Sequence, residues 1–212
     1  EIQNTFKLTE DQMKGEAARR NMPQLSWGDI WVTTEDSYPV FFAPDIWSGN
    51  ADDSWQETGS GTENSPYIIS SAEQLYSVAK ASPEATAGKH FKLAKDIYLN
   101  KVEDTKWAAG KGNRQWITNV SAGDTAGFAG IFDGDWHTVY GLYYNVKKLS
   151  GDAGIAAGLF PKASAHAVIK NLNLSDSHIY IDKNVSGDGY ASALIGYISS
   201  PGVTIEKCYV TN

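Results

Sequence analysis

Three stretches between residues 130 and 210 share one order of small, apolar and turn-forming residues, and this internal repeat constrains the fold more than any other feature. They begin at Gly130-Ile-Phe, Gly158-Leu-Phe and Ala193-Leu-Ile, continue through a polar turn, and end in alternating apolar positions. Leu142, Leu172 and Cys208 mark matching positions, 30 and 36 residues apart. Because a period in this range is typical of stacked supersecondary units, we expect a repeat array.

Short strands, period-two apolar positions and intervening turns predict an all-β fold, a parallel β-helix whose coils stack about 4.8 Å apart. The matched placement of Val139, Ile169 and Ile205 predicts parallel, in-register pairing over residues 127–212. Asn171 is expected to continue a polar ladder at a corner. The side chains expected to point inward are Leu142, Leu172, Leu174, Ile179, Ile181 and Cys208.

Two capped segments are the only substantial helices that the sequence predicts. Thr9 can cap a helix over residues 9–21, with Gln12 as its capping-box partner. Ser71 and Gln74 form a second capping box, and Pro83 should end the helix that follows.

The chain is predicted to divide near residue 45. Residues 1–44 form a helix–strand segment, and residues 45–212 form the repeat domain, which opens with a loop rich in Trp, Gly, Ser and Asn. Within it, residues 67–69 and 90–99 are predicted strands, the second interrupted by a turn or bulge near Lys95. The chain ends immediately after the last strand of a repeat, so we expect a piece excised from a larger protein.

Composition excludes several classes of function. The net charge is −7 and only three of the 18 basic residues are arginines, which disfavours nucleic-acid binding. No run of 18 apolar residues predicts a transmembrane helix, and no signal peptide begins the sequence. The single cysteine, Cys208, occupies a core position of the repeat and is interpreted as a buried apolar residue.

No residue pattern predicts catalysis. Asp133 and Asp135 are the best-placed carboxylate pair, followed by Asp52 and Asp53, but Asp-Gly-Asp is an ordinary turn sequence. The four histidines show no zinc-binding spacing. We therefore expect no catalytic residue, no metal site and no cofactor.

Tryptophans in polar, glycine-rich surroundings are the remaining signal for ligand binding. Such residues can stack on sugars or anchor a partner protein, or they can pack against the side of a coil. Between the two in the insertion 100–126, Trp116 is expected to pack and Trp107 to be the more exposed. The candidate ligand-binding residues are Trp107, Trp116, Arg114, Trp47 and Trp55.

Four ordered segments resemble the opening of GLUG-motif repeat proteins: Asp45-Ile-Trp-Ser-Gly49, Ser65-Pro-Tyr-Ile-Ile through Leu75, Phe91-Lys-Leu-Ala-Lys-Asp-Ile-Tyr-Leu99, and Phe128-Ala-Gly-Ile-Phe-Asp-Gly134. The likeness spans residues 45–212, and residues 8–44 look similar to the close of a preceding module. These are bacterial surface or secreted proteins, and similar repeats accompany some IgA-specific metallopeptidase domains. The resemblance implies a right-handed parallel β-helix and an extracellular setting.

Together these observations favour a non-catalytic module of a bacterial cell-surface or secreted protein. Its role would be adhesion or display, with host glycans or surface proteins and the neighbouring repeats of the parent chain as partners. The alternatives are a fragment of a carbohydrate-active β-helix enzyme, either a polysaccharide lyase or a glycoside hydrolase, and a structural stalk without a ligand.

Overall fold

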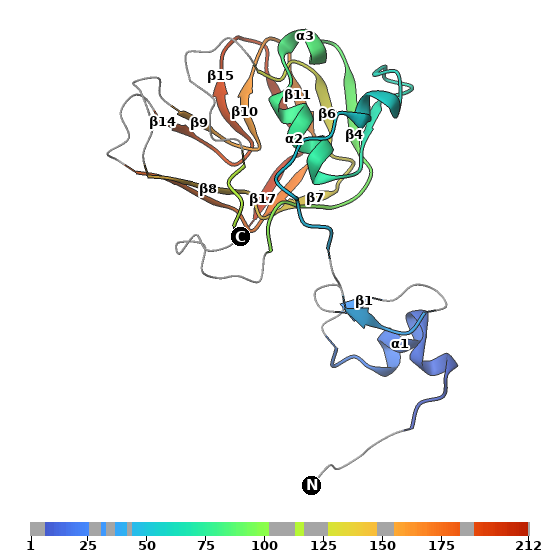
Figure 1. The fold of residues 1–212 in the computed structure, drawn as a ribbon. Helices are drawn as coiled ribbons and strands as arrows, with labels where there is room; N and C mark the ends of the chain where they lie inside the picture. The colour runs from blue at the N-terminus through green and yellow to red at the C-terminus, as the bar shows by residue number, and fades with distance from the viewer. Residues whose placement is uncertain are drawn as a thin grey trace. The chain divides into compact units, whose positions relative to one another are not determined.

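The chain folds mostly into strands with few helices, and it divides into two compact units, Glu1–Pro44 and Asp45–Asn212 (Figure 1). The computed structural model describes residues 7–25, 31–32, 37–41, 44–101, 113–116, 127–147, 155–182 and 189–211. Every sheet described in the second unit is parallel.

The first unit contains short elements. Its helical segment begins with the predicted capping box, because the Thr9 N–H donates to Gln12 Oε1 (2.9 Å) and the Gln12 N–H donates to Thr9 Oγ1 (3.4 Å). The prediction of one helix over residues 9–21 was wrong, since Lys14 is extended and Gly15 has φ of +50°. A 3-10 turn η1 (Asp11–Met13) and a helix α1 (Gly15–Asn21) result, followed by an antiparallel pair, β1 (Trp31–Val32) and β2 (Val40–Phe41).

Helical elements of the second unit lie early in its sequence. The Gln74 N–H donates to Ser71 Oγ (3.2 Å), which confirms Ser71 as the N-cap of the helix α2 (Ala72–Lys80). The Gln74 side chain reaches back to the Ser70 N–H rather than to Ser71. Pro83 lies beyond the end of α2, but it also starts a further helical turn, α3. These elements are η2 (Ser54–Glu57), α2 (Ala72–Lys80) and α3 (Pro83–Thr86).

Two large parallel sheets and three strand pairs make up the rest of the second unit. The first sheet has the order β3 (Tyr67–Ile69), β4 (His90–Leu93), β6 (Ile131–Asp133), β11 (Val168–Lys170) and β16 (Thr204–Glu206). The second has the order β5 (Ile97–Tyr98), β7 (Thr138–Tyr140), β12 (Asn173–Ser175) and β17 (Tyr209–Thr211). The pairs are β8 (Tyr143–Val146) with β13 (His178–Ile181), β9 (Ile155–Ala157) with β14 (Gly189–Ala191), and β10 (Phe160–Ala163) with β15 (Ile195–Ile198).

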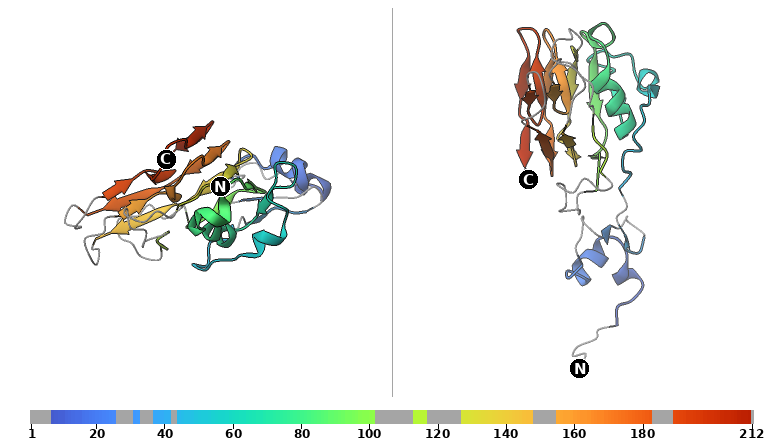
Figure 2. Two further views of the ribbon diagram at one scale, coloured as in Figure 1. Left: turned by 90° about the horizontal axis from the view of Figure 1, so that it is seen from above. Right: turned by 60° about the vertical axis from the view of Figure 1, so that its left-hand side comes forward.

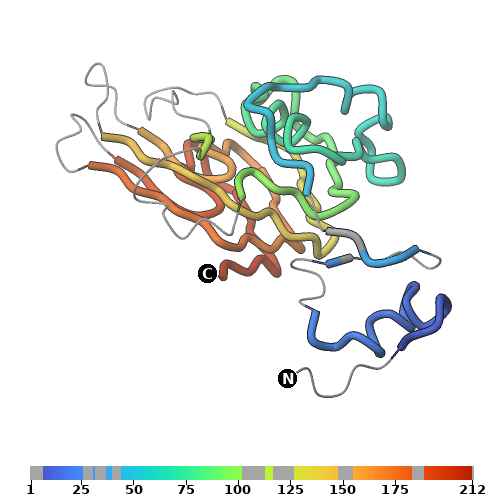
Figure 3. Tube along the Cα trace, turned by 60° about the horizontal axis from the view of Figure 1, so that its bottom comes forward, coloured from blue at the N-terminus to red at the C-terminus, as the bar shows by residue number. Residues whose placement is uncertain are grey.

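Successive passes of the chain therefore lie side by side in the same direction. Figure 2 shows the colour advancing from green through yellow and orange to red across the strands of both sheets, and the tube in Figure 3 follows the same progression. Parallel pairing between repeats, predicted for residues 127–212, is confirmed for the described strands.

The predicted alignment of the first repeat was wrong. Ile169 lies opposite Phe132 on one side and Ile205 on the other, whereas Val139 lies opposite Leu174. The reason is that the similar motifs Gly130-Ile-Phe and Gly158-Leu-Phe, which were aligned, occupy different strands. Ile131 begins β6 in the first sheet, whereas Leu159 precedes β10. Residues 134–137 also make the first corner longer than the two-residue corner 171–172.

The core lies between the sheets and is continuous. Of the predicted inward positions, Leu142, Leu172 and Leu174 are fully buried, which confirms them. Ile179, Ile181 and Cys208 are partly buried and pack against the same core. Burial raises the pKa of the Cys208 thiol, in keeping with the interpretation of this residue as an apolar core position. Aromatic rings fill the wider part of the core: Phe91, Phe128, Phe132 and Phe160 contact one another at centroid distances of 4.8–6.3 Å.

Candidate surface on the second sheet

Three of the predicted ligand-binding tryptophans are core residues. Trp47, Trp55 and Trp116 are all buried, and each indole N–H has a protein acceptor. The acceptors are the Asn50 carbonyl (2.8 Å), Ser77 Oγ (3.0 Å) and the Leu159 carbonyl (2.8 Å). The expectation of ligand contact is therefore corrected for Trp47 and Trp55, and the packing expected of Trp116 is confirmed, because a large ring with its polar atom satisfied gains more by packing than by exposure.

The other two candidates differ from these. Arg114 is exposed, and its backbone is fixed by the buried Asn100 side chain, which accepts from the Arg114 N–H (2.7 Å) and donates to its carbonyl (3.0 Å). Arg114 thus remains available to a ligand. Trp107 lies outside the described residues.

The Asp133–Asp135 pair forms a turn, as predicted. Asp133 Oδ1 accepts the Asp135 N–H (2.9 Å) and Asn171 Nδ2 (2.9 Å), while Lys170 Nζ lies 3.5 Å from its other oxygen. Partial burial raises the pKa of Asp133, but these donors outweigh burial and hold the pKa below its usual value. A glycosidic general acid needs a raised pKa, so the direction of this shift opposes that role.

The second carboxylate pair also makes local bonds. Asp52 accepts from the Ser54 N–H (2.9 Å) and the Ser54 hydroxyl (2.8 Å), which lowers its pKa, and Asp53 accepts from Ser77 Oγ. Within the described residues, no three His, Cys, Asp or Glu side chains gather as metal ligands. No described helix combines the length and hydropathy that crossing a membrane requires.

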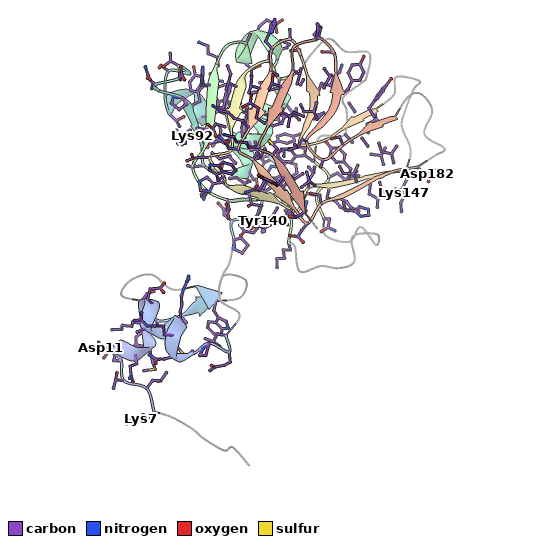
Figure 4. The ribbon with its side chains drawn as sticks, turned by 180° about the vertical axis from the view of Figure 1, so that it is seen from behind. Lys7, Asp11, Lys92, Tyr140, Lys147 and Asp182 are labelled. Atoms are coloured by element: carbon purple, nitrogen blue, oxygen red, sulfur yellow. The ribbon has the colours of Figure 1, made fainter. Side chains whose placement is uncertain are left out.

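The outer side of the second sheet carries a regular set of aromatic and polar side chains, here called the outer face. Two cross-strand columns compose it, fixed by the register of β5, β7, β12 and β17. Figure 4 labels Tyr140 at the margin of the unit. The first column is Thr138, Asn173 and Tyr209, and the second is Tyr98, Tyr140, Ser175 and Thr211.

Tyr140 lies between two very different neighbours in the second column. On one side the Tyr98 ring is stacked on it, with centroids 4.6 Å apart and planes 9° from parallel. On the other side lies Ser175, whose short side chain cannot cover a phenol ring. Tyr140 is half-buried, so part of its side chain is exposed beside Ser175.

Polar groups surround that space. Ser175 Oγ donates to Asp176 Oδ2 (2.8 Å), and Thr211 Oγ1 donates to Ser175 Oγ (3.3 Å). Asp176 has φ of +52°, which belongs to the corner that follows β12. A ring stacked on Tyr140 would thus meet hydroxyl groups, which accept and donate hydrogen bonds, and a carboxylate, which accepts them.

Trp136 adds an exposed aromatic ring beside the same strand. It precedes β7 with φ of +67°, its side chain is 54% exposed, and its carbonyl accepts from Asn173 Nδ2 (2.9 Å). Trp136 lies in the turn that precedes β7, and Tyr140 is the last residue of that strand. Between them Asp96 Oδ1 accepts the Thr138 N–H (2.9 Å) and lies 3.3 Å from His137 Nδ1.

Comparisons with known proteins give distant similarity. The chain is 30% identical to halomucin of Haloquadratum walsbyi over 122 residues, which is 58% of this chain and 1% of halomucin. It is 29% identical over 152 residues, 71% of this chain, to 15% of a protein named as a Gly-rich membrane protein in Evansella cellulosilytica. The chain thus spans a small part of the length of these curated relatives. No family model and no solved structure matches it.

Sequence reasoning missed Trp136 and Tyr140. Trp136 directly follows the turn sequence Asp-Gly-Asp, and this position predicts an exposed side chain. The choice of tryptophans by the composition of their surroundings did not include it. Tyr140 alternates with the buried Val139, so its outward direction follows from strand periodicity. Its neighbour Ser175 follows only from the register, and that register was misassigned in the first repeat.

Proposed function

We propose that residues 45–212 are a right-handed parallel β-helix module, similar to GLUG-motif repeats, of a bacterial cell-surface or secreted protein. In this proposal the module has no catalytic role and binds glycans through its outer face. The parallel register of successive strands supports the architecture. The name of halomucin and that of the Gly-rich membrane protein support an envelope setting.

The observation that carries glycan binding is the half-buried Tyr140 ring, which lies opposite the short Ser175 side chain. Its first face is stacked on Tyr98, so the ring is held in place before any ligand arrives, and little side-chain entropy remains to be lost. Sugar rings have apolar C–H faces and hydroxyl edges. Stacking over Ser175 would place the edge against the Ser175–Asp176–Thr211 hydrogen-bond network.

A glycan array probed with the full chain tests the proposal, with two variants at the same site. Tyr140→Ala removes the stacking face and should weaken binding about two- to tenfold, since one aromatic stack contributes roughly 0.5–1.5 kcal/mol and 1.4 kcal/mol is a factor of ten. Ser175→Tyr should abolish binding, because the new ring would occupy the position of the sugar. The substitution is at an outward position and should leave the fold unchanged.

The matched control is Tyr180→Ala, which removes a tyrosine that is 44% exposed on a different sheet, in β13. It should leave the array pattern unchanged. Binding that survives both Tyr140→Ala and Ser175→Tyr would place the glycan elsewhere. If the array gave no signal and a protein ligand bound with an affinity that depends on Tyr140, the outer face would bind a protein and not a glycan.

A further inference from the structure

Two tyrosines on neighbouring passes of the chain lie ring against ring on the outer face. Tyr98 ends β5, Tyr140 ends β7, and the two residues are directly opposite each other in the parallel register. Their rings are stacked, with centroids 4.6 Å apart and planes 9° from parallel. A second tyrosine pair, Tyr190 with Tyr197, is tilted by 55°. Because β5 and β7 are parallel, the Tyr98 and Tyr140 side chains leave the sheet in the same direction, and their phenols lie side by side.

Both phenols are accessible to small molecules in solution. Tyr98 alternates with the buried Ile97 and Tyr140 with the buried Val139, so both side chains point away from the core. Each of the two tyrosines is half-buried, and Figure 4 shows Tyr140 at the margin of the unit. A diffusible oxidant therefore reaches the pair while the sheet remains folded.

The two strands that the pair connects share a short register. β5 has two residues, and its pairing with β7 contains two residue pairs. The tyrosines are 42 positions apart in a sequence with a single cysteine, so no disulfide within these residues can join the two passes. A covalent bond between the rings would close this long loop and restrict the unfolded chain, which stabilises the folded state.

We propose that Tyr98 and Tyr140 are the site of an intramolecular dityrosine cross-link, made by a peroxidase-type one-electron oxidant that consumes hydrogen peroxide. Each phenol loses one electron and one proton, which leaves a tyrosyl radical on each of the facing rings. The radicals form a carbon–carbon bond between the positions ortho to the two hydroxyls, and the hydrogens on those carbons move to the phenol oxygens. In total the chain loses two hydrogen atoms, and one hydrogen peroxide is reduced to two waters.

Stacking favours coupling within this pair over coupling between chains. A tyrosyl radical forms the bond only when it meets a second one, and two rings held in contact meet at a high effective concentration. Radicals on exposed tyrosines such as Tyr38 and Tyr209 meet those of other chains by diffusion. The yield of the Tyr98–Tyr140 bond should therefore be independent of protein concentration, whereas links between chains should increase with it.

Oxidation of the full chain by a peroxidase and hydrogen peroxide tests the proposal. The monomer is isolated by size exclusion, its dityrosine fluorescence is recorded, and it is digested with trypsin. Mass spectrometry should find peptide 96–101 joined to peptide 115–147, at the sum of their masses less two hydrogen atoms. Because the second peptide also contains Tyr143 and Tyr144, fragment spectra assign the bond to Tyr140.

Phenylalanine variants separate the phenol from the ring. Tyr98→Phe and Tyr140→Phe keep a ring in the stack but lack the phenol oxygen, so each should abolish the joined peptides. Tyr190→Phe, in the tilted pair, is the matched control and should leave their yield unchanged. The cross-linked monomer should unfold at a higher urea concentration than the untreated chain, whereas Tyr98→Phe treated in the same way should show no such shift.

Two results would overturn the proposal. One is the absence of the joined peptides from a reaction in which added free tyrosine does couple. The other is a bond between Tyr98 and Tyr140 that appears only in dimers, with a yield that rises with protein concentration, because the two rings would then come from different chains.

Discussion

The Asp133 carboxylate shows how one residue distinguishes a turn from a catalytic site. Its sequence context, Asp-Gly-Asp, fits either role. In the structure its oxygens accept from the Asp135 N–H and Asn171 Nδ2 and face Lys170 Nζ, so the charged form is the stabilised one. Asn171 has φ of +51°, a conformation that asparagine tolerates better than most residues. The corner between the two sheets is therefore held by a charged hydrogen bond between successive passes of the chain.

A double-mutant cycle between Asp133→Asn and Asn171→Gly should show pH-dependent coupling. The pKa of Asp133 is lowered in the folded state, so the native protein binds fewer protons than the unfolded chain just below pH 4. The stabilisation is present above that pH and is lost as pH falls through the folded pKa. We expect coupling of about 1–2 kcal/mol at pH 7, declining below about pH 4. Urea unfolding measures it, and coupling that is constant from pH 7 to pH 3 would contradict the assignment.

At the scale of elements, sequence periodicity predicted strand type and direction but not the pairing of every strand. Strands β3 and β4 were predicted within a residue or two, and the break near Lys95 separates β4 from β5. The first repeat was misaligned because its corner has two more residues than the next one, and periodicity carries no information on corner length. For the same reason the Tyr140–Ser175 pair was beyond prediction. The tryptophans were ambiguous because packing and ligand contact favour the same residue type.

The closed edge of β3 depends on a side chain that no strand pattern reveals. Thr58 follows η2, and its hydroxyl accepts the Ile68 N–H while lying 2.7 Å from Trp55 O and 3.2 Å from Ile68 O. The Thr58 hydroxyl thus provides a hydrogen-bond acceptor for one N–H group of β3, whereas a neighbouring strand would provide acceptors along the whole edge.

Thr58→Val should destabilise the second unit by about 1 kcal/mol, because the Ile68 N–H loses its acceptor while side-chain volume is kept. Hydrogen exchange should accelerate at Ile68 in particular. Thr138→Val, on the outer side of β7, provides a control of the same chemistry within a central strand. Equal losses of stability in the two variants would show that the hydroxyl at Thr58 has no special role.

At the scale of the second unit, stability is expected to vary along the stack. In a repeat array each pass contacts mainly its neighbours, so a strand between two passes is held on both sides and an outermost strand on one. The aromatic core, from Trp55 through Phe91 to Phe160, begins beside β3 and β4. Aliphatic residues replace the rings toward β16, where the buried Ile169 of β11 lies opposite the half-exposed Ile205.

Ile169 and Ile205 offer a matched measurement of this gradient, since they are the same residue at the same register position on adjacent strands. Ile169→Ala removes buried methyl groups and leaves a cavity, so it should cost about 2–5 kcal/mol in urea unfolding. Ile205→Ala deletes the same atoms from a side chain that is 48% exposed and should cost about half as much or less. If the two substitutions cost the same, the difference in burial between Ile169 and Ile205 does not hold in solution.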